Sequence, residues 1–528
     1  MPTAVVIGAG IAGLSTAALL SREGFAVTVL ESRDMVGGRA SSFTLDGFRF
    51  DLGPSWYLMP EVFEHFFALM GTSAAAELDL VRLDPAYRVY YEHAEPLDLR
   101  SDLEHSVALF EQVEPGAGER LRAYLASASD TYTMAVRHFL YTTFASLLPL
   151  VNRDVLRRTP RLGRLLTQSL QGRIEATVTD VRLRQVLGYP AVFLGSAPGL
   201  TPSMYHLMSH LDLVDGVLYP QGGFGTLIDA VRRVAERAGA TVLTGADVSA
   251  ILTEPAAPGR RGGRIARATG VRYAAADGEH VLAADLVVST ADLFHTEHQL
   301  LPVELRSRSA RWWRSQVPGP STVMVYLGVR GELTELAHHS LFFAEAWDET
   351  FDQIFAPLTD APPAPMPNPT SVYLSRVTAT DASAAPPGHE NLVVLVPVPA
   401  DVRAGRGGID GAGDGWVEQV ADRAIAQIAA WAHIPDLAER VVVRRTVGPA
   451  DWADDLRAWR GTALGPAHTL RQSALFRAGN TARRVDGLLY AGGSVTPGIG
   501  LPMCLISAEL VVKRLRGDTS TGQLSEVG

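Results

Sequence analysis

The chain has 528 residues, of which 47% are hydrophobic and 20% are charged, with a formal net charge of −10. This length predicts about two to four domains, or one nucleotide-binding domain with large insertions. The acidic balance argues against a general nucleic-acid binder. A single cysteine, Cys504, excludes a disulfide framework and a cysteine-based zinc site. We therefore expect no nucleic-acid partner, no metal and a reducing, cytoplasmic location.

The N-terminus predicts neither a secretory leader nor a membrane span. Its apolar run lacks a preceding basic region and is interrupted by Gly8, Gly10 and Gly13. No stretch of about 18 apolar residues occurs along the chain. We expect a protein that is soluble or attached to a membrane surface.

The first 31 residues predict a nucleotide-binding βαβ unit. Residues 4–7 and 26–30 have the pattern of buried parallel strands, and residues 11–22 that of a helix between them. The glycines at 8, 10 and 13 have the G-x-G-x-x-G spacing, which allows a tight turn, a close approach to a pyrophosphate and close helix packing. Glu31 can accept the hydroxyls of an adenosine ribose, which argues against NADP.

Two more glycines and an arginine follow the acid. Gly37 and Gly38 let the chain pass close to a diphosphate, and Arg39 can neutralise it. The alternative is a surface turn with a solvated arginine. Asp46 and Gly47 then predict a hairpin turn, and the 51–56 stretch (DLGPSW) a second turn followed by a tryptophan.

The stretch 137–184 is basic and rich in leucine within an acidic protein. Such a helical segment can lie in a membrane interface. The alternative is a solvated helical cap over a substrate cavity. We leave both open, since a lid helix can also be the helix that docks on a membrane.

The middle of the chain alternates helix and strand patterns. We expect a helix at 226–238 after a glycine cluster, and strands at 240–243, 248–252 and 284–292. A second region, 300–440, carries strand patterns at 321–329 and 391–398 and an amphipathic helix at 415–434. Turn-rich loops are expected at 254–264 and 358–369.

The C-terminus repeats the strand, glycine and helix pattern of the N-terminus. A strand at 488–491 leads into Gly492 and Gly493, and a helix is expected at 503–516. A helix N-terminus behind glycines can hold a phosphate, so the second half of a nucleotide site is expected here.

These motifs together resemble the CrtI-type phytoene desaturases of bacteria, within the FAD-dependent amine oxidase superfamily. The resemblance rests on 4–31, Gly37-Gly38-Arg39, 51–63, 219–223 and 492–503, and it is weakest at 254–264 and 300–440. It implies an α/β fold, with a Rossmann-type FAD-binding domain of the GR2-like flavoprotein kind and an interleaved α+β substrate domain. Many family members carry Thr-His-Pro-Gly at 495–498, where this chain has Val-Thr-Pro-Gly, so no imidazole is expected at that loop.

The resemblance also implies a division of the chain and a set of cofactor contacts. We expect FAD-binding parts at 1–70, 201–299 and 481–528, substrate-domain parts at 71–136 and 300–480, and a helical lid or membrane-docking segment at 137–200. FAD contacts are expected at Gly8, Gly10, Ile11, Ala12, Gly13, Glu31, Ser32, Gly38, Arg39, Gly53, Pro54, Ser55, Val248, Gly493, Ser494, Gly500, Leu501, Pro502 and Met503.

The activity that the resemblance implies is repeated desaturation of phytoene to neurosporene or lycopene. Hydride would pass to FAD and a proton would leave the resulting cation, while the protein positions the polyene and excludes water. No catalytic residue stands out; Asp51 is a candidate by position, with turn capping as the alternative role. Other expectations considered are an amine oxidase, against which no aromatic pair is visible near the terminal motif, and a lipid-escort protein, against which the flavin motif is intact. A lipophilic polyene as substrate implies peripheral attachment to a membrane.

Overall fold

The computed structural model describes residues 1–53, 55–151, 153–256 and 264–525. Its nucleotide part is a parallel five-stranded sheet in the order β20-β13-β1-β2-β9. The strands are β1 (Thr3–Ile7), β2 (Ala26–Leu30), β9 (Thr241–Leu243), β13 (Leu286–Ser289) and β20 (Leu488–Tyr490). The chain leaves β1 for β2 on one side, while β13 lies on the other, so a topological switch point falls beside β1. This is the α/β, Rossmann-type arrangement that the N-terminal motif predicted.

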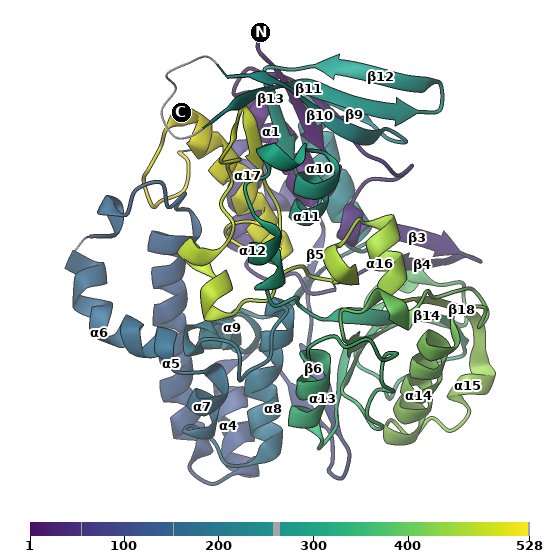
Figure 1. The fold of residues 1–528 in the computed structure, drawn as a ribbon. Coiled ribbons are helices and arrows are strands. Elements are labelled where there is room, and N and C mark those ends of the chain that lie inside the picture. The colour runs from purple at the N-terminus through teal and green to yellow at the C-terminus, as the bar shows by residue number, and fades with distance from the viewer. Residues whose placement is uncertain (54, 152, 257–263, 526–528) are drawn as a thin grey trace.

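Successive side chains of β1 point to opposite faces of this sheet, and the two faces are covered by different elements. Ala4 and Val6 pack in one core with the helices, whereas Val5 and Ile7 pack in another core with the antiparallel strands. The helices are α1 (Ile11–Arg22), α10 (Phe224–Arg237) and α17 (Leu501–Arg516). The antiparallel strands are β10 (Asp247–Pro255), β11 (Ala266–Ala275) and β12 (Gly278–Ala283), and β19 (Val485–Asp486) joins β11. Figure 1 shows these layers at the top of the molecule.

The second sheet has seven strands in the order β18-β14-β17-β16-β15-β6-β7. It is antiparallel except where β15 pairs with β6. The strands are β6 (Tyr87–Tyr91), β7 (Leu97–Leu99), β14 (Ser321–Arg330), β15 (His339–Phe343), β16 (Val372–Arg376), β17 (His389–Val398) and β18 (Val441–Val447). Helices α14 (Gly415–Trp431) and α15 (Leu437–Arg440) pack on it, as an α+β substrate domain requires.

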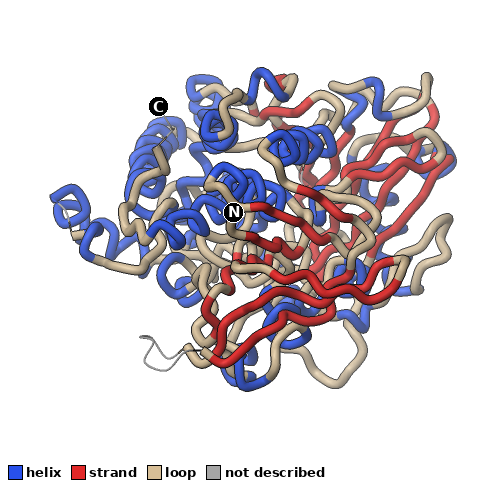
Figure 2. Tube along the Cα trace, turned by 90° about the horizontal axis from the view of Figure 1, so that it is seen from above, coloured by secondary structure: helices blue, strands red, loops and turns tan. Residues whose placement is uncertain are grey.

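The third region is helical and lies beside the second sheet in Figure 1. It contains α4 (Leu103–Val113), α5 (Ala117–Ala135), α6 (Arg153–Thr167), α7 (Leu170–Glu175), α8 (Val181–Gly188) and α9 (Met208–His210). Short 3-10 or π turns join them: η2 (Val136–Leu140), η3 (Leu148–Leu150), η4 (Tyr189–Leu194), η5 (Ser203–Leu207) and η6 (Leu211–Asp215). Helix α6 projects from the body of the molecule, and in Figure 2 the helices gather on one side and the long strands on the other.

Shorter elements connect these regions. They are β3 (Ser42–Leu45), β4 (Phe48–Asp51), α2 (Pro60–Leu69), α3 (Ala74–Glu77), β5 (Leu80–Arg82), β8 (Leu218–Pro220), α11 (Leu293–Gln299), α12 (Ala310–Arg314), α13 (Trp347–Ile354) and α16 (Pro449–Asp455). In the described part of the chain, no helix has the length and apolar character needed to cross a membrane.

The predicted elements are confirmed with shifts at their ends. Of the strand expected at 284–292, only Leu286–Ser289 forms β13. The hairpin turn forms at Asp46 and Gly47, whose φ angles of 48° and 84° are the left-handed values that a two-residue turn requires. Helix α10 begins at Phe224 rather than at 226, and α17 at Leu501 rather than at 503, because Gly223 and Gly500 are their N-caps. The expected loop at 254–264 lies mostly outside the described residues, and the division into domain parts stays a prediction.

Candidate functional site

One cavity of about 560 Å³ lies where the nucleotide sheet meets the second sheet and the helical region. Its walls come from both ends of the chain, including residues of the first glycine loop, residues 30–32 and 37–40, and residues 492–494, 497 and 499–504. Of the expected cofactor contacts, the lining includes Gly8, Gly10, Ile11, Ala12, Glu31, Ser32, Gly38, Arg39, Gly53, Ser55, Val248, Gly493, Ser494, Gly500, Leu501, Pro502 and Met503. Gly13 lies behind the wall, and Pro54 is outside the described residues.

The first glycine loop is shaped by close backbone contacts. Gly8 has a φ of 97°, which opens the turn after β1. A Cβ on Gly13 would lie 1.9 Å from the carbonyl oxygen of Gly8, so α1 can pack this closely only on glycine. Gly10 is the N-cap of α1, and the first turn has neither a side-chain cap nor an acidic residue. The free N–H groups at this helix end therefore suit an anion in the cavity.

Glu31 lies at the end of β2, where the sequence predicted a ribose contact. Its side chain is 7% exposed and lines the cavity. Oε2 accepts a 2.7 Å hydrogen bond from the N–H of Ala9, and Oε1 accepts one of 3.1 Å from the N–H of Arg33. The carboxylate thus ties the glycine loop to the end of β2 and keeps further lone pairs for a ligand.

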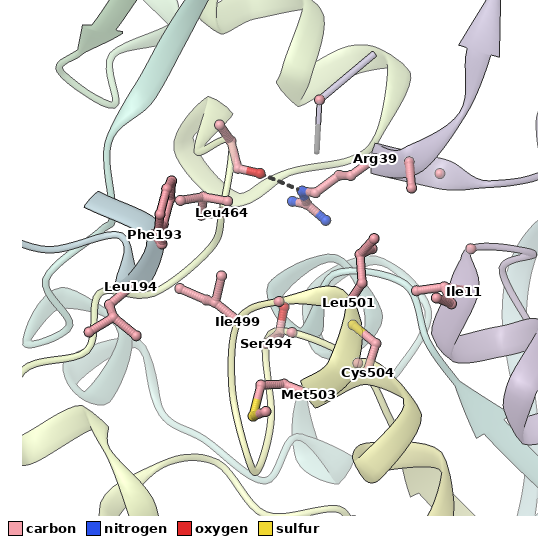
Figure 3. A pocket seen from close by; sticks show the side chains of 18 of the residues that line it. Ile11, Arg39, Phe193, Leu194, Leu464, Ser494, Ile499, Leu501, Met503 and Cys504 are labelled. Carbon is pink, nitrogen blue, oxygen red and sulfur yellow. Dashed lines mark hydrogen bonds between the residues drawn. The ribbon is translucent and has the colours of Figure 1, made fainter. Parts of the chain in front are cut away.

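Arg39 brings a positive charge into the cavity. Its Nε donates a 2.8 Å hydrogen bond to the carbonyl of Ala463, and its buried Nη2 has no hydrogen-bond partner among the described residues (Figure 3). Burial lowers the pKa of the guanidinium, and Asp292 opposes that shift. A buried cationic donor without a partner is costly, so an anionic ligand at this place fits the residues present.

The C-terminal motif provides the opposite wall. The N-cap of α17, Gly500, has no side-chain cap, and the first turn carries no acid. In Figure 3 Leu501, Met503 and Cys504 of α17 lie near Ser494 and Ile499 of the preceding loop. Two helix N-termini, one from each end of the chain, therefore face the same cavity.

Two buried residues that the sequence did not indicate hold the C-terminal loop. Arg477 donates to the carbonyl of Gly493 at 2.5 Å and to that of Val495 at 3.2 Å, and burial lowers its pKa to about 10. The imidazole of His468 accepts a 3.3 Å hydrogen bond from the N–H of Ile499 at Nε2. Neither residue lies in a recognisable motif, so only long-range packing brings them to the loop.

His468 corrects the expectation that no imidazole lies at this loop. Its ring lines the cavity and packs so closely on Gly498 that a Cβ there would be 2.4 Å away. Since Nε2 is an acceptor, Nδ1 carries the proton and donates to the Tyr205 hydroxyl, 2.8 Å away. Burial holds the pKa of His468 well below its usual value. The ring is therefore a neutral hydrogen-bonding group. It comes from residue 468, whereas the family pattern has its histidine within the 495–498 loop.

The side chain of Asp51 caps the start of helix α10. Its Oδ2 accepts a 3.0 Å hydrogen bond from the N–H of Phe224, and its Oδ1 accepts one of 2.6 Å from the hydroxyl of Ser42. Burial raises its pKa, and these hydrogen bonds oppose the shift. Asp51 is not among the described residues that line the cavity, so it joins β4 to the start of α10 and does not face a ligand there.

Away from the helix N-termini the cavity continues as an apolar arm, formed by the lining residues within 132–211 and 341–373. No described member of the apolar arm is charged. The charged lining residues of the described chain are Glu31, Arg39, Asp247, Asp292, Asp455 and Arg457. Arg457 pairs with Asp247 at 3.0 Å, beside the expected cofactor contact Val248. Charge is therefore confined to the nucleotide side of the cavity.

Aromatic rings form one side of the apolar arm and are called the aromatic wall below. Its members are Trp56, Tyr189, Phe193, Phe343, Trp347, Phe351 and Tyr373. Their ring centroids follow one another at 4.9 to 6.5 Å. Trp56 comes directly after the expected cofactor contact Ser55, so the aromatic wall begins beside the nucleotide site. Tyr189 and Phe193 share η4, and Trp347 and Phe351 share α13, but the wall as a whole joins segments that are distant in the sequence. Of its members, the sequence therefore indicated only Trp56.

Solved structures share this fold. An oxidoreductase from Methanosarcina mazei matches with a TM-score of 0.62 at 18% identity, over 97% of this chain and all of that one. Putrescine oxidase bound to putrescine matches with a TM-score of 0.60 at 16% identity, over 98% and 99% of the two chains. At such identities the likeness shows the fold alone.

Sequence comparison is more specific. A carotenoid 3,4-desaturase from Haloarcula japonica is 39% identical over 97% of this chain and 98% of its own length. A zeta-carotene-forming phytoene desaturase from Myxococcus xanthus is 35% identical over 97% and 93%. The profile of the flavin-containing amine oxidoreductases matches residues 11–516. The chain therefore belongs to the flavin-containing amine oxidoreductase family and takes FAD as its cofactor.

Proposed function

We propose that this enzyme desaturates acyclic carotenoids, with phytoene as the substrate and neurosporene or lycopene as the product. The observation that carries the proposal is the apolar arm, whose described lining is uncharged and largely aromatic or aliphatic. Contact between such a surface and a hydrocarbon chain is favourable, because both bury apolar area. A polar ligand would lose its hydrogen bonds to water there without replacing them. The desaturase relatives, which span nearly the whole chain, support the same substrate class.

We infer that FAD lies between the two helix N-termini, with its diphosphate at Arg39 and its ribose at Glu31. The unpartnered Nη2 of Arg39 and the uncapped first turns of α1 and α17 support this placement. When bound, FAD supplies the acceptor for a hydride. The chain contributes binding, orientation of the polyene along the apolar arm and exclusion of water.

A second candidate is a 3,4-desaturation of a carotenoid that is already conjugated, because the Haloarcula japonica relative carries that name. Both reactions need an apolar arm, so the two differ in substrate and not in chemistry. An amine oxidase would need an anion or a carbonyl cluster for a cationic substrate, and the charged groups of this cavity lie on its nucleotide side.

Expression in cells that make phytoene, and in parallel cells that make lycopene, tests the proposal. We expect the phytoene strain to accumulate coloured polyenes, and Arg39→Ala to abolish the colour. Colour change in the lycopene strain alone would assign the 3,4-desaturation instead. Unchanged polyenes in both strains would contradict a carotenoid substrate.

We also propose that the enzyme takes up its substrate at a membrane surface. Leu148 and Val151 are 80% and 65% exposed, and they follow Phe139, Leu140 and Phe144, which line the apolar arm. Leu475 and Phe476, at 51% and 57% exposed, likewise follow the lining residue Ala474. Exposed apolar side chains next to a cavity end suit an interface with lipid.

Flotation with anionic liposomes tests this docking surface. We expect Leu148→Asp combined with Phe476→Asp to reduce the floated fraction severalfold, and Arg153→Ala with Arg157→Ala to reduce it at low salt. Arg158 is left in place because it is bonded to Asp130. Val281→Asp is the control, since Val281 is 63% exposed on β12 in the nucleotide part. Equal flotation of all variants would contradict the docking surface.

A further inference from the structure

A buried carboxyl lies behind the aromatic wall. Asp212 is 2% exposed and belongs to η6, whose first residue, Leu211, lines the cavity. Its Oδ2 accepts a 2.7 Å hydrogen bond from the hydroxyl of Tyr189 and one of 3.0 Å from that of Tyr87. Its Oδ1 has no hydrogen-bond partner within the described chain. A buried carboxyl is ordinarily paired with a cation, but the described hydrogen-bond partners of this one are two tyrosine hydroxyls.

Neighbouring charged groups are engaged elsewhere. His210, two residues earlier, pairs with Asp215 at 3.3 Å and contacts the hydroxyl of Ser129. On α7, Arg173 lies over the ring of Tyr124, on the side of α5 that faces this cluster. The cluster around Asp212 therefore consists of a carboxyl and tyrosines, which is unusual unless the carboxyl has a function beyond packing.

Tyr189 connects this carboxyl to the cavity. Its ring belongs to the aromatic wall, with centroids 6.1 Å from Trp56, 5.6 Å from Phe193 and 5.9 Å from Phe343. Its hydroxyl donates to Asp212 while the residue lines the cavity, so the ring lies between the carboxyl and the apolar arm. Tyr87 bonds the same oxygen but is not among the described lining residues.

The chemistry of desaturation gives this arrangement a use. When hydride leaves a polyene for FAD, the C–H bonding pair leaves with it, and positive charge remains spread over the carbon chain. Aromatic faces attract such a charge through their ring quadrupoles. A fixed negative charge behind the ring adds to this attraction, because the surrounding interior screens charge weakly.

We propose that Asp212 is a positioning residue for catalysis, whose negative charge acts through the ring of Tyr189 to stabilise the cation that forms on the polyene. The inference rests on the proposed function. It adds a protein group to a reaction for which no catalytic side chain was evident from the sequence.

The titration of the cluster makes the inference testable. Burial raises the pKa of Asp212 to about 7, and the two tyrosine hydroxyls oppose that shift. Burial also raises the pKa values of Tyr189, Tyr87 and Tyr124, and it lowers that of His206, beside Tyr124, to about 3. Near neutral pH these four groups stay uncharged, so among Asp212 and the tyrosines that bond it the change in charge belongs to Asp212. Burial also raises the pKa of Asp215, which pairs with His210 and not with this cluster. The turnover rate should rise as this carboxyl ionises.

The experiment uses the FAD-loaded enzyme with phytoene in liposomes. For the wild type we expect kcat to rise with pH with an apparent pKa of about 7. Asp212→Asn should flatten this rise and lower kcat about fivefold above it, with KM unchanged, since a cation–π contribution of about 1 kcal/mol corresponds to that factor. Asp212→Glu should restore a rise with pH.

Two tyrosine variants separate this role from a structural one. Tyr189→Phe keeps the ring but cuts the link to the carboxyl, and we expect it to lower kcat as Asp212→Asn does. Tyr91→Phe is the matched control: Tyr91 is on the same strand as Tyr87, is buried and bonds the carbonyl of Arg182, so its kcat and pH profile should match the wild type. Should Asp212→Asn fail to fold, Tyr189→Phe alone decides.

A wild-type pH profile and rate in Asp212→Asn, or in Tyr189→Phe, would overturn the inference. A change confined to KM or to thermal stability in these variants would also overturn it, because a purely structural role for Asp212 predicts that result. Failure of the proposed function looks different, because the wild type would then convert no polyene at any pH.

Discussion

The side chain of Arg39 donates its Nε hydrogen bond to the backbone carbonyl of Ala463, 424 residues further along the chain. This contact joins the first nucleotide segment to the second half of the protein. It fixes the guanidinium at the cavity wall and leaves the buried Nη2 for a ligand. Arg39 therefore both connects the two halves of the chain and lines the proposed FAD site.

Replacing Arg39 should weaken FAD binding without removing the fold. We expect Arg39→Ala to raise the Kd for FAD by about tenfold to a hundredfold, because hydrogen bonds to charged groups contribute about 1.5 to 3 kcal/mol. Titration of apoprotein with FAD, followed by flavin fluorescence, gives this value. Arg33→Ala is the control, since Arg33 is in the same loop, bonds Ser41 and Met35, and does not line the cavity. Equal Kd values for the two variants would contradict the assigned role of Arg39.

The single cysteine gives a direct probe of the cavity. Burial raises the pKa of Cys504 to about 11, while Arg39 opposes the shift, so the thiol is protonated at neutral pH. We expect thiol reagents to label the native protein far more slowly than the unfolded chain, and FAD to slow the reaction further. Fast labelling that FAD does not change would show that Cys504 is not in the cofactor cavity.

Gly13 should tolerate no side chain. A Cβ there would meet the carbonyl oxygen of Gly8 at 1.9 Å, so α1 would have to move away from the sheet. We expect Gly13→Ala to lower the free energy of unfolding by about 3 kcal/mol and to reduce bound flavin. The control is Gly163→Ala in α6, where a Cβ meets nothing within 4 Å. Thermal melts in which both variants resemble the wild type would contradict the close packing of α1.

Asp212 predicts how stability changes with pH. Its pKa is raised from 3.8 to about 7 on folding, so the folded protein holds this proton more tightly than the unfolded chain. Its contribution to the free energy of unfolding is therefore full below about pH 4 and is lost as the pH rises to about 7. We expect the Tm of Asp212→Asn, relative to the wild type, to increase between about pH 4 and pH 7. A constant difference in Tm would show that the carboxyl titrates normally.

The parts of the fold that sequence predicted are those that local geometry dictates. Gly8 and the Asp46-Gly47 pair need left-handed backbone angles, and such positions are visible as glycine or Asx residues in the right spacing. The strands and helices of the nucleotide sheet likewise follow from apolar periodicity within short windows. Expected cofactor contacts fall on one cavity because each motif already carried its own strand, turn and helix.

What the sequence did not predict depends on contacts between distant segments. His468 meets Ile499 and Tyr205, and Tyr189 meets Asp212, through packing that no local pattern encodes. Asp51 is the opposite case, a residue that the sequence did single out. Its position beside the flavin motif suggested a catalytic role, but its hydrogen bonds cap α10. Residues of this kind become visible only when burial and partners are known.

The most direct test of the central claim is anaerobic mixing of the FAD-loaded enzyme with phytoene in liposomes. We predict that the visible absorbance of the flavin bleaches while the absorbance of a longer conjugated polyene appears, because the hydride lost by the substrate reduces the cofactor. Persistence of the oxidised flavin with phytoene and with lycopene, together with bleaching by a diamine such as putrescine, would contradict it.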